Sequence, residues 1–361
     1  VFIVSTDAII VSLKLGRRIL MSQENSGNSN SMQKADLLEL PEFREMKMRA
    51  EAAEARLRRI YNTPFWRYSK LIRKFYARIS QALLKKKESK FVFVPNKEEG
   101  ASVIDLVRGK TLIEVNNANL SASAIAVVAH FSKTIEVSQS LELYIQGLQS
   151  NGFQVILVSA CEAEGKLKFD SDLTNSLTII RKPNLGYDFG SWAVAFDMFQ
   201  EILNADEIML TNDSLLGPFD DISELISKLR SSKFDVTGIT DNSQLQYHIQ
   251  SYIVHLKRTA LKNSNTINLL KSVVHLGLKN DVILKYELGL TRIAQLSGLF
   301  VGAIFPWNLI TTPEKNPSLA GWQRLIELGF PFLKREAVRL GSHSEVMQMK
   351  KYIKTNYSEG D

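Results

Sequence analysis

The sequence predicts an α/β fold in which a mostly parallel β-sheet carries helices on both faces. Two observations lead to this prediction: short apolar runs alternate with segments of helical periodicity between residues 123 and 240, and polar side chains cluster where the apolar runs end. Strands separated by helices of this length form parallel sheets, because each helix returns the chain to the start of the next strand. The chain has 361 residues, 45% of them apolar, which is enough for a sizeable core.

The first residues are not expected to join this sheet. Residues 1–20 hold an apolar run that Asp7 and Lys14 interrupt, and it is too short and too polar to span a bilayer. Residues 22–31 form a polar, low-complexity run with few apolar side chains to offset the entropy of ordering. We therefore expect a disordered or non-native tail over residues 1–32.

A basic helical arm is predicted over residues 33–90. Apolar residues recur at helical spacing, and prolines at positions 41 and 64 divide the arm into two or three helices. Residues 56–90 contain 12 Lys and Arg and one acid, a net charge of 12 − 1 = +11, which leaves 7 − 11 = −4 for the rest. Interleaved aromatic residues suit contact with an anionic membrane surface, and a solvated linker helix is the alternative. No nucleic-acid motif accompanies the charges, so no nucleic-acid partner is expected.

The remaining chain divides into a linker over residues 91–122, a domain over 123–345 and a C-terminal tail over 346–361. Within the domain, apolar runs predict five strands, at residues 123–131, 153–161, 176–181, 207–211 and 234–240. Helical periodicity predicts the segments between them, at residues 141–148, 188–204 and 220–231.

Polar residues follow three of these strands, and open parallel sheets bind ligands outside the carboxyl ends of their strands. The fourth strand runs into Asn212, Asp213 and Ser214, and the fifth is followed by Asp241. A carboxylate beside amide and hydroxyl oxygens is a ligand set for Mg²⁺ or Mn²⁺ held partly by substrate phosphates. Capping of the following turn is the alternative role for the same residues.

The third strand runs into NLGYDFGSW, residues 184–192. Gly186 and Gly190 permit close approach of the backbone to a ligand, and Asp188 opens a helix. This segment places a second polar cluster beside the first.

Five motifs in order resemble the rhamnan synthesis protein F family, whose members are glycosyltransferase-like enzymes of bacterial cell-surface polysaccharide assembly. They are NLGYDFGSW, LTNDSLLGPF, DVTGITDN with HIQSYIVHLK, YELGLT, and NPSLAGWQRLIELGFPFLKREAV, over about residues 130–340. The first two also resemble family-2 glycosyltransferases of type A fold. The resemblance implies a nucleotide-diphospho-sugar transferase-like domain.

The resemblance also implies roles for individual residues. Asp213 takes the place of the last metal-binding Asp of a D-x-D motif, whereas Thr211 stands where the first Asp would be. One carboxylate in place of two implies a divalent cation that arrives with the nucleotide-sugar donor. The expected donor-binding residues are Asn184, Gly186, Asp188, Asn212, Asp213, Ser214 and His248.

An inverting transfer needs a base that takes the proton from the acceptor hydroxyl. The resemblance to family-2 glycosyltransferases implies a base downstream of Asp213 at a helix start, which makes Glu287 the first candidate. Attraction to the helix N-terminus is its alternative role. Asp241 is the second candidate, and a polar core position is the alternative for His248. With the resemblance, Lys334 and Arg335 are expected to hold a phosphate of the nucleotide or of a lipid-linked acceptor, and solvation at the surface is their alternative role.

Together with these observations, the resemblance implies a cytoplasmic glycosyltransferase, peripheral to the inner face of the plasma membrane, that adds rhamnose from a nucleotide-diphosphate donor to a glycan or lipid-linked glycan. Two alternatives belong to other classes. One is a non-catalytic scaffold of a polysaccharide-assembly complex, which Thr211 suggests, and the other is a membrane-surface binding protein that acts through the basic arm.

Overall fold

A computed structural model describes residues 100–357, and the central feature of this part is a nine-stranded sheet. Its strands are β1 (Leu112–Asn116), β2 (Ala124–His130), β3 (Gln154–Ser159), β4 (Leu177–Arg181), β5 (Glu207–Asn212), β7 (Val236–Asn242), β8 (His248–Ile249), β9 (Ile253–Lys257) and β10 (Val301–Phe305). The predicted tail 1–32 and basic arm 33–90 lie outside the described residues.

The sheet is mixed, and six of its nine strands run in the same direction. Its order is β1-β4-β3-β2-β5-β9-β7-β10, and β8 pairs with β7 outside this path. The neighbours β4, β3, β2 and β5 are mutually parallel, as are β7 and β10. Strand β9 is antiparallel to both β5 and β7, so β5 and β7 run in the same direction. Their carboxyl ends therefore lie at the same edge of the sheet, with the start of β9 between them.

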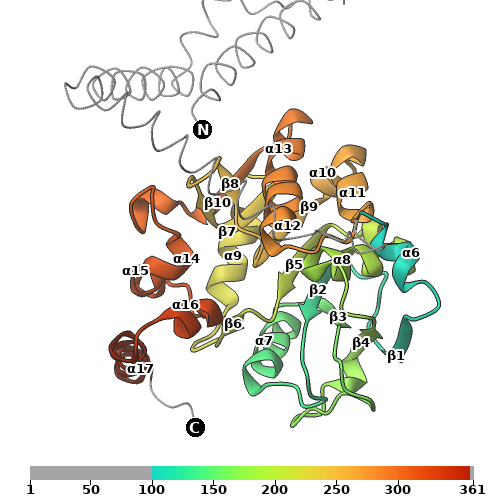
Figure 1. The fold of residues 1–361 in the computed structure, drawn as a ribbon, viewed down its shortest axis with the longest axis horizontal. Helices are drawn as coiled ribbons and strands as arrows, with labels where there is room; N and C mark the ends of the chain where they lie inside the picture. The colour runs from blue at the N-terminus through green and yellow to red at the C-terminus, as the bar shows by residue number, and fades with distance from the viewer. Residues whose placement is uncertain (1–99, 358–361) are drawn as a thin grey trace, which may run out of the picture. The chain divides into compact units, whose positions relative to one another are not determined.

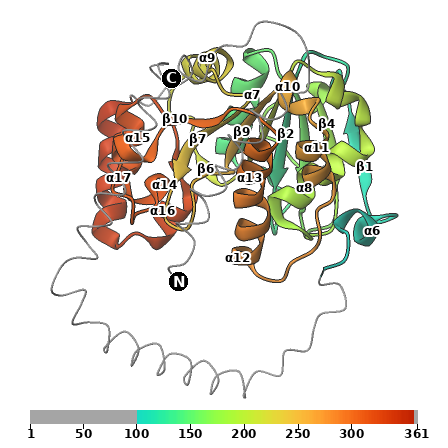
Figure 2. The same cartoon turned by 90° about the horizontal axis from the view of Figure 1, so that it is seen from above.

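Helices cover both faces (Figures 1 and 2). The longer ones are α7 (Gln139–Ser150), α8 (Tyr187–Met198), α9 (Ser223–Ser231), α11 (Ser264–Lys271), α13 (Leu288–Leu296) and α17 (His343–Asn356). The shorter ones are α6 (Val103–Val107), η1 (Thr174–Ser176), η2 (Gln200–Asn204), α10 (Arg258–Leu261), α12 (Lys279–Val282), η3 (Ile283–Glu287), η4 (Trp307–Leu309), α14 (Pro317–Ala320), α15 (Trp322–Glu327) and α16 (Arg335–Leu340). Figure 2 shows α7 and α9 on one side of the sheet and α8, α11 and α13 on the other.

The side chains of β2 explain why both faces are covered. All seven of its residues are buried, as in a strand enclosed on both sides. Because side chains alternate along a strand, Ile125 and Val127 join the core under α8, whereas Ala126 and Val128 join the core under α7. The predicted α/β class, a mostly parallel sheet with helices on both faces, is confirmed.

The folded part extends beyond the expected limits 123–345 in the described residues. Within the range expected as a linker, α6 packs in the core beside α8, and β1 forms an edge strand paired with β4. Within the range expected as a tail, α17 begins at a capping box in which Ser342 and Glu345 exchange hydrogen bonds. None of the helices described is long and apolar enough to cross a membrane.

A second, two-stranded sheet brings a distant segment to the end of β5. Strand β6 (Leu215–Leu216) pairs antiparallel with β11 (Leu333–Lys334). The backbone N–H of Arg335 also donates to the carbonyl of Ser214, at 2.8 Å. Two residues predicted to bind phosphate, Lys334 and Arg335, thus lie next to the predicted metal-binding segment.

Candidate functional site

A cavity of about 1010 Å³ opens at the carboxyl ends of β5 and β7. Its volume is at the upper end of the range for pockets that hold small-molecule ligands, about 300–1,000 Å³. Eight of the residues singled out in the sequence line it, namely Asp188, Asn212, Asp213, Ser214, His248, Glu287, Lys334 and Arg335. They come from five separate segments between Asp188 and Arg335 and meet only in the fold.

Three of the predicted residues do not line this cavity. Asn184 is exposed, and its amide donates to Glu162 at 3.4 Å. Asp241 is buried, and its carboxylate accepts a hydrogen bond of 2.6 Å from the backbone N–H of Trp307. Asp241 thus connects the end of β7 to the segment after β10.

Gly186 is the third, and its surroundings show why glycine stands there. Its φ is +80°, and a Cβ at this position would lie 2.6 Å from Val103 Cγ2 and 2.9 Å from Gly190 Cα. A Cβ on Gly190 would lie 2.6 Å from the carbonyl oxygen of Leu185. Both glycines allow α6, the loop and α8 to pack closely, so the close approach is between parts of the chain and not toward a ligand.

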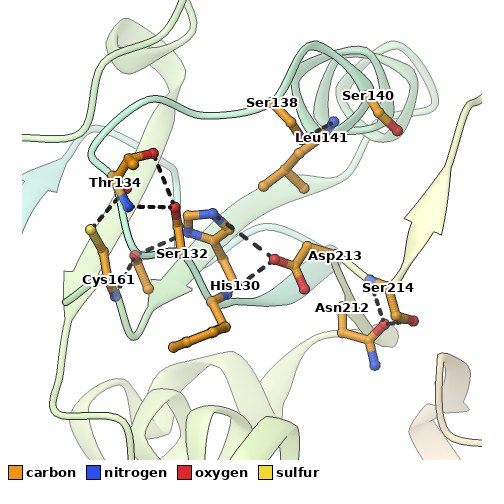
Figure 3. Close-up of polar contacts among 12 residues, drawn as sticks. His130, Ser132, Thr134, Ser138, Ser140, Leu141, Cys161, Asn212, Asp213 and Ser214 are labelled. Atoms are coloured by element: carbon orange, nitrogen blue, oxygen red, sulfur yellow. Dashed lines mark hydrogen bonds and ion pairs between the residues drawn. The ribbon is translucent and has the colours of Figure 1, made fainter. Parts of the chain in front are cut away.

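Asp213 lies directly after β5 and lines the cavity. Figure 3 shows its carboxylate beside His130. Its Oδ2 accepts a hydrogen bond of 3.1 Å from the backbone N–H of Phe131 at the end of β2. Burial raises the pKa of Asp213 to about 6, and the charge of Asp188 adds to the increase, while the Phe131 N–H opposes it. A carboxylate held partly desolvated in a cavity is poised to bind a cation or a positively charged group.

His130, which the sequence analysis did not select, lies beside Asp213. Its Nδ1 is 3.0 Å from Ser159 Oγ, and its Nε2 is 4.0 Å from Asp213 Oδ2. Burial lowers its pKa to about 4, and the positive charges of Arg181 and Arg335 contribute. His130 is therefore neutral at pH 7, so its contact with Asp213 is not an ion pair. Its position at the end of a predicted strand was the available signal.

Asn212 links Asp188 to the turn after β5. Its amide Nδ2 donates to the Asp188 carboxylate at 2.7 Å, and its Oδ1 accepts from the backbone N–H of Ser214 at 3.1 Å. Burial raises the pKa of Asp188, and the hydrogen bond from Asn212 counteracts part of that increase. The two polar clusters predicted at neighbouring strand ends are joined by this contact.

Thr211 points away from the cavity. It is fully buried, and its hydroxyl accepts from the Tyr144 hydroxyl at 3.1 Å and donates to the Tyr252 carbonyl at 2.8 Å. A carboxylate at this position would occupy the core between β5, α7 and β9. The residue at the place of the first D-x-D carboxylate is thus a core residue in this fold.

Glu287 ends the π-helical turn η3, where the backbone N–H of Leu288 bonds to the carbonyl of Ile283 five residues earlier. Turns of this type often occur at functional sites. The Glu287 side chain is 14% exposed. Burial by itself would raise its pKa, but the hydrogen bond from His248, the charge of Lys334 and the hydrogen bond from Ser251 lower it below the ordinary value.

Two basic side chains form another part of the cavity wall. The Lys334 ammonium lies 4.9 Å from the centre of the Tyr252 ring, and burial lowers its pKa, which the charge of Glu287 partly counteracts. The Arg335 guanidinium donates to Ser138 Oγ at 3.0 Å and to the Leu215 carbonyl at 3.2 Å. These contacts use the Nε–H group and one of the two Nη2–H groups of Arg335.

Tyr187 is a second residue that sequence reasoning missed. It lines the cavity with 42% of its surface exposed, and its φ of +53° is unusual for a bulky residue. Such backbone conformations concentrate at functional sites. The preceding Gly186, also in the left-handed region, was the only sequence signal of a special backbone here.

The residues present do not form a closed metal centre. Among residues 100–357 no group of three His, Cys, Asp or Glu side chains could hold a metal ion. Asp213 offers carboxylate oxygens, whereas Asn212 Oδ1 is already used by Ser214. A divalent cation at Asp213 would need most of its ligands from water or a bound phosphate, as Mg²⁺ commonly does.

The fold and this cavity define an α/β protein in which acidic, basic and hydroxyl side chains meet beyond the ends of parallel strands, the place where such sheets bind ligands. The model of the rhamnan synthesis protein F family matches residues 155–359, more than half of the chain. The chain belongs to this family, which confirms the resemblance found in its motifs.

Curated relatives and solved structures show more distant similarity. Virulence protein VirA of Vibrio anguillarum is 29% identical over 227 residues, covering 54% of this chain and 72% of VirA. Uncharacterized protein y4gN of Sinorhizobium fredii is 25% identical over 185 residues, covering 49% of this chain and 48% of y4gN. The catalytic domain of Drosophila β1,4-galactosyltransferase 7 with xylobiose is 12% identical, with coverages of 54% and 68% and a TM-score of 0.29. A197 from STIV is 12% identical, and the match covers 49% of this chain and 79% of A197 with a TM-score of 0.25.

Proposed function

We propose that this protein is a glycosyltransferase that moves a sugar from a nucleotide-diphosphate donor to a hydroxyl of a glycan acceptor. The observation that carries the proposal is that Asp213, Glu287, Lys334 and Arg335 line one cavity at the carboxyl ends of parallel strands. Sugar transfer from a diphosphate needs positive charge near the leaving phosphates and a base near the acceptor. The cavity contains side chains suited to both tasks.

Donor binding is assigned to the side of the cavity near β2, β5 and α8. Arg335 has guanidinium N–H groups left for a phosphate beyond its bonds to Ser138 and Leu215. Asp213 would hold a divalent cation, and that cation would neutralise charge on the diphosphate when bound. Tyr187, exposed at the cavity wall, offers a flat face for a nucleobase. Asp188, Asn212 and Ser214 maintain the shape of this wall.

Glu287 is the proposed base. Its carboxylate is ionised near neutral pH, since its pKa lies below the ordinary value, and it lines the same cavity as the donor residues. In an inverting transfer Glu287 would take the proton of the acceptor hydroxyl as that oxygen attacks the anomeric carbon. Lys334, whose charge acts on Glu287, would stabilise negative charge in the same region.

Rhamnose is the proposed sugar and a bacterial surface polysaccharide the proposed product, and both rest on membership of the rhamnan synthesis protein F family. The reaction would take place on the cytoplasmic face of the plasma membrane, where a lipid-linked glycan is one class of acceptor. The basic stretch at residues 56–90, with its net charge of +11, would favour contact with anionic lipid there.

A donor panel tests the proposal. The whole chain is titrated by calorimetry with dTDP-rhamnose, UDP-sugars and GDP-sugars, each with and without Mn²⁺. We expect saturable binding of at least one donor and tighter binding with Mn²⁺. Absence of binding to every donor under both conditions would contradict the enzymatic assignment.

A further inference from the structure

We infer that His248 is a positioning residue that holds the carboxylate of Glu287 toward the acceptor, and not a donor contact. The inference rests on the proposed function and assigns a task within the same cavity. It depends on three observations: the orientation of the His248 ring, the way the Glu287 carboxylate is held, and the charges around the pair.

The orientation of the His248 ring is fixed. His248 begins β8, which pairs with the end of β7, and only 4% of its surface is exposed. Its Nδ1 lies 2.7 Å from the backbone carbonyl of Gln246. A carbonyl only accepts hydrogen bonds, so Nδ1 carries a proton. The other ring nitrogen, Nε2, faces Glu287 Oε1 at 3.4 Å.

The Glu287 carboxylate is held from both of its oxygens. Oε1 faces His248, and Oε2 accepts a hydrogen bond of 2.8 Å from the Ser251 hydroxyl. Both partners come from the short segment 248–251, whereas Glu287 comes from the π-helical turn. A further bond of 3.1 Å, from the Ile249 N–H to Thr291 Oγ1, ties this segment to α13. The carboxylate is therefore fixed between two elements that are themselves joined.

The charges around the pair favour an imidazolium next to a carboxylate. Burial alone would lower the pKa of His248, but the Glu287 and Gln246 contacts and the charge of Asp241 raise it overall. Lys334 also acts on Glu287, and Lys334 in turn interacts with Lys279, Glu336 and Asp188. When both ring nitrogens of His248 are protonated, Nε2 donates to the Glu287 carboxylate. This contact keeps Glu287 ionised until it takes the proton from the acceptor hydroxyl.

Four variants separate positioning from a general structural effect. His248→Ala removes the contact, His248→Gln retains an N–H donor without the charge, and Ser251→Ala removes the other, uncharged donor to Glu287. His343→Gln, on exposed α17, is the matched control. Each full-length variant is assayed for kcat and for the donor KM across pH, and its folding is checked by thermal unfolding.

We expect His248→Ala to lower kcat about 10–100-fold with a donor KM within about threefold of the parent, because a misplaced base loses much of its catalytic contribution. His248→Gln should recover most of kcat. The acid limb of its kcat-against-pH profile should move up by about one pH unit, because loss of a neighbouring cation raises the pKa of Glu287. Ser251→Ala should shift the acid limb of the profile by less. His343→Gln should leave kcat, the donor KM and the pH profile unchanged. A raised donor KM with unchanged kcat in His248→Ala would overturn the inference in favour of donor contact.

A measurement without turnover distinguishes this inference from the proposed function. The ring signals of the five histidines are followed by NMR across pH, and His248→Gln assigns the His248 signal. We expect Glu287→Gln to lower the His248 midpoint by about one unit or more. A His248 midpoint that Glu287→Gln leaves unchanged would overturn the positioning role. If Glu287→Gln does lower the His248 midpoint but the parent chain transfers no sugar, the proposed function is wrong while the contact between His248 and Glu287 stands.

Discussion

The amide of Asn212 donates a hydrogen bond of 2.7 Å to the carboxylate of Asp188. This contact joins the end of β5 to the first turn of α8, two elements whose polar ends were predicted separately from the sequence. It explains how a carboxylate whose pKa burial raises is accommodated at the cavity wall. The candidate site thus depends on a polar connection within the sheet edge as well as on the residues that face a ligand.

The first prediction concerns this contact. Asn212→Ala leaves the Asp188 carboxylate without its donor, and we expect a loss of about 1–3 kcal/mol in the free energy of unfolding. Asp188→Ala added to Asn212→Ala should restore part of that loss, because no carboxylate then remains to be satisfied. Urea unfolding of both single variants and the double variant measures the coupling. Strict additivity of the two changes would mean that the bond contributes nothing.

The second prediction links Asp213 to pH-dependent stability. Because the folded pKa, about 6, lies above the ordinary 3.8, ionised Asp213 destabilises the fold at pH values above the folded pKa, and this cost is absent below the unfolded pKa. Asp213→Asn should therefore be more stable than the parent by about 1–3 kcal/mol above pH 7, with the gain shrinking toward pH 4. Denaturant unfolding at several pH values checks this, and a gain independent of pH would contradict it.

The third prediction concerns the place of the absent D-x-D carboxylate. Thr211→Asp should not create a metal site but should destabilise the protein by about 3 kcal/mol or more, because an unpaired carboxylate would be buried beside Tyr144 and the Tyr252 carbonyl. Thr211→Ser, which retains the hydroxyl, is the control and should cost about 1 kcal/mol. Thermal unfolding with and without Mn²⁺ measures both. A Thr211→Asp protein that Mn²⁺ stabilises more than the parent would show that this side chain reaches the cavity.

The fourth prediction addresses catalysis. Asp213→Ala and Glu287→Gln should each reduce sugar transfer by about 10²-fold or more, the first through donor binding and the second through kcat. Glu201→Gln, an exposed carboxylate in η2, is the control and should transfer at the parent rate. The measurement is the rate at which radiolabelled sugar moves from a nucleotide-sugar donor to isolated glycan. Equal transfer by the parent and both site variants would show that the chemistry lies elsewhere, and a folded parent that binds donor without transfer would favour a scaffold.

The fifth prediction concerns Gly186, whose added Cβ would meet Val103 at a positive φ. Gly186→Ala should lower stability by about 1–3 kcal/mol, from backbone strain and the clash together. Adding Val103→Ala should relieve the clash but not the strain, so the double variant is expected to recover less than the whole loss. Val103→Ala alone supplies the reference for the cavity it creates. If Gly186→Ala unfolds at the parent midpoint, the proposed packing reason for this glycine is wrong.

The inner strands of the sheet could be predicted because they are apolar runs buried on both faces. The predicted strands at 123–131 and 207–211 correspond to β2 and β5, and the third and fifth predicted strands to β4 and β7. Asp213 could be selected because it directly follows an apolar run, and the motif resemblance then favoured a ligand-binding role for it and pointed to Glu287. These signals are local in the chain, so one sequence contains them.

What the sequence did not reveal depends on contacts between distant segments. Strand β9 lies antiparallel between β5 and β7, and its His-containing sequence lacks a clear apolar run. Gly186 was interpreted as a ligand-approach position because glycine gives no information about which neighbour requires it. His130 and Tyr187 reach the cavity only through the arrangement of β2 and α8.

The central claim is that this cavity binds a nucleotide-diphospho-sugar with its diphosphate near Asp213 and Arg335 and its sugar toward Glu287. A crystal structure of the whole chain with dTDP-rhamnose and Mn²⁺ tests it most directly. We predict electron density for the diphosphate within contact distance of Arg335, a cation at the Asp213 carboxylate and the sugar between that cation and Glu287. Donor density outside this cavity, with Asp213 and Glu287 free of ligand, would contradict the account.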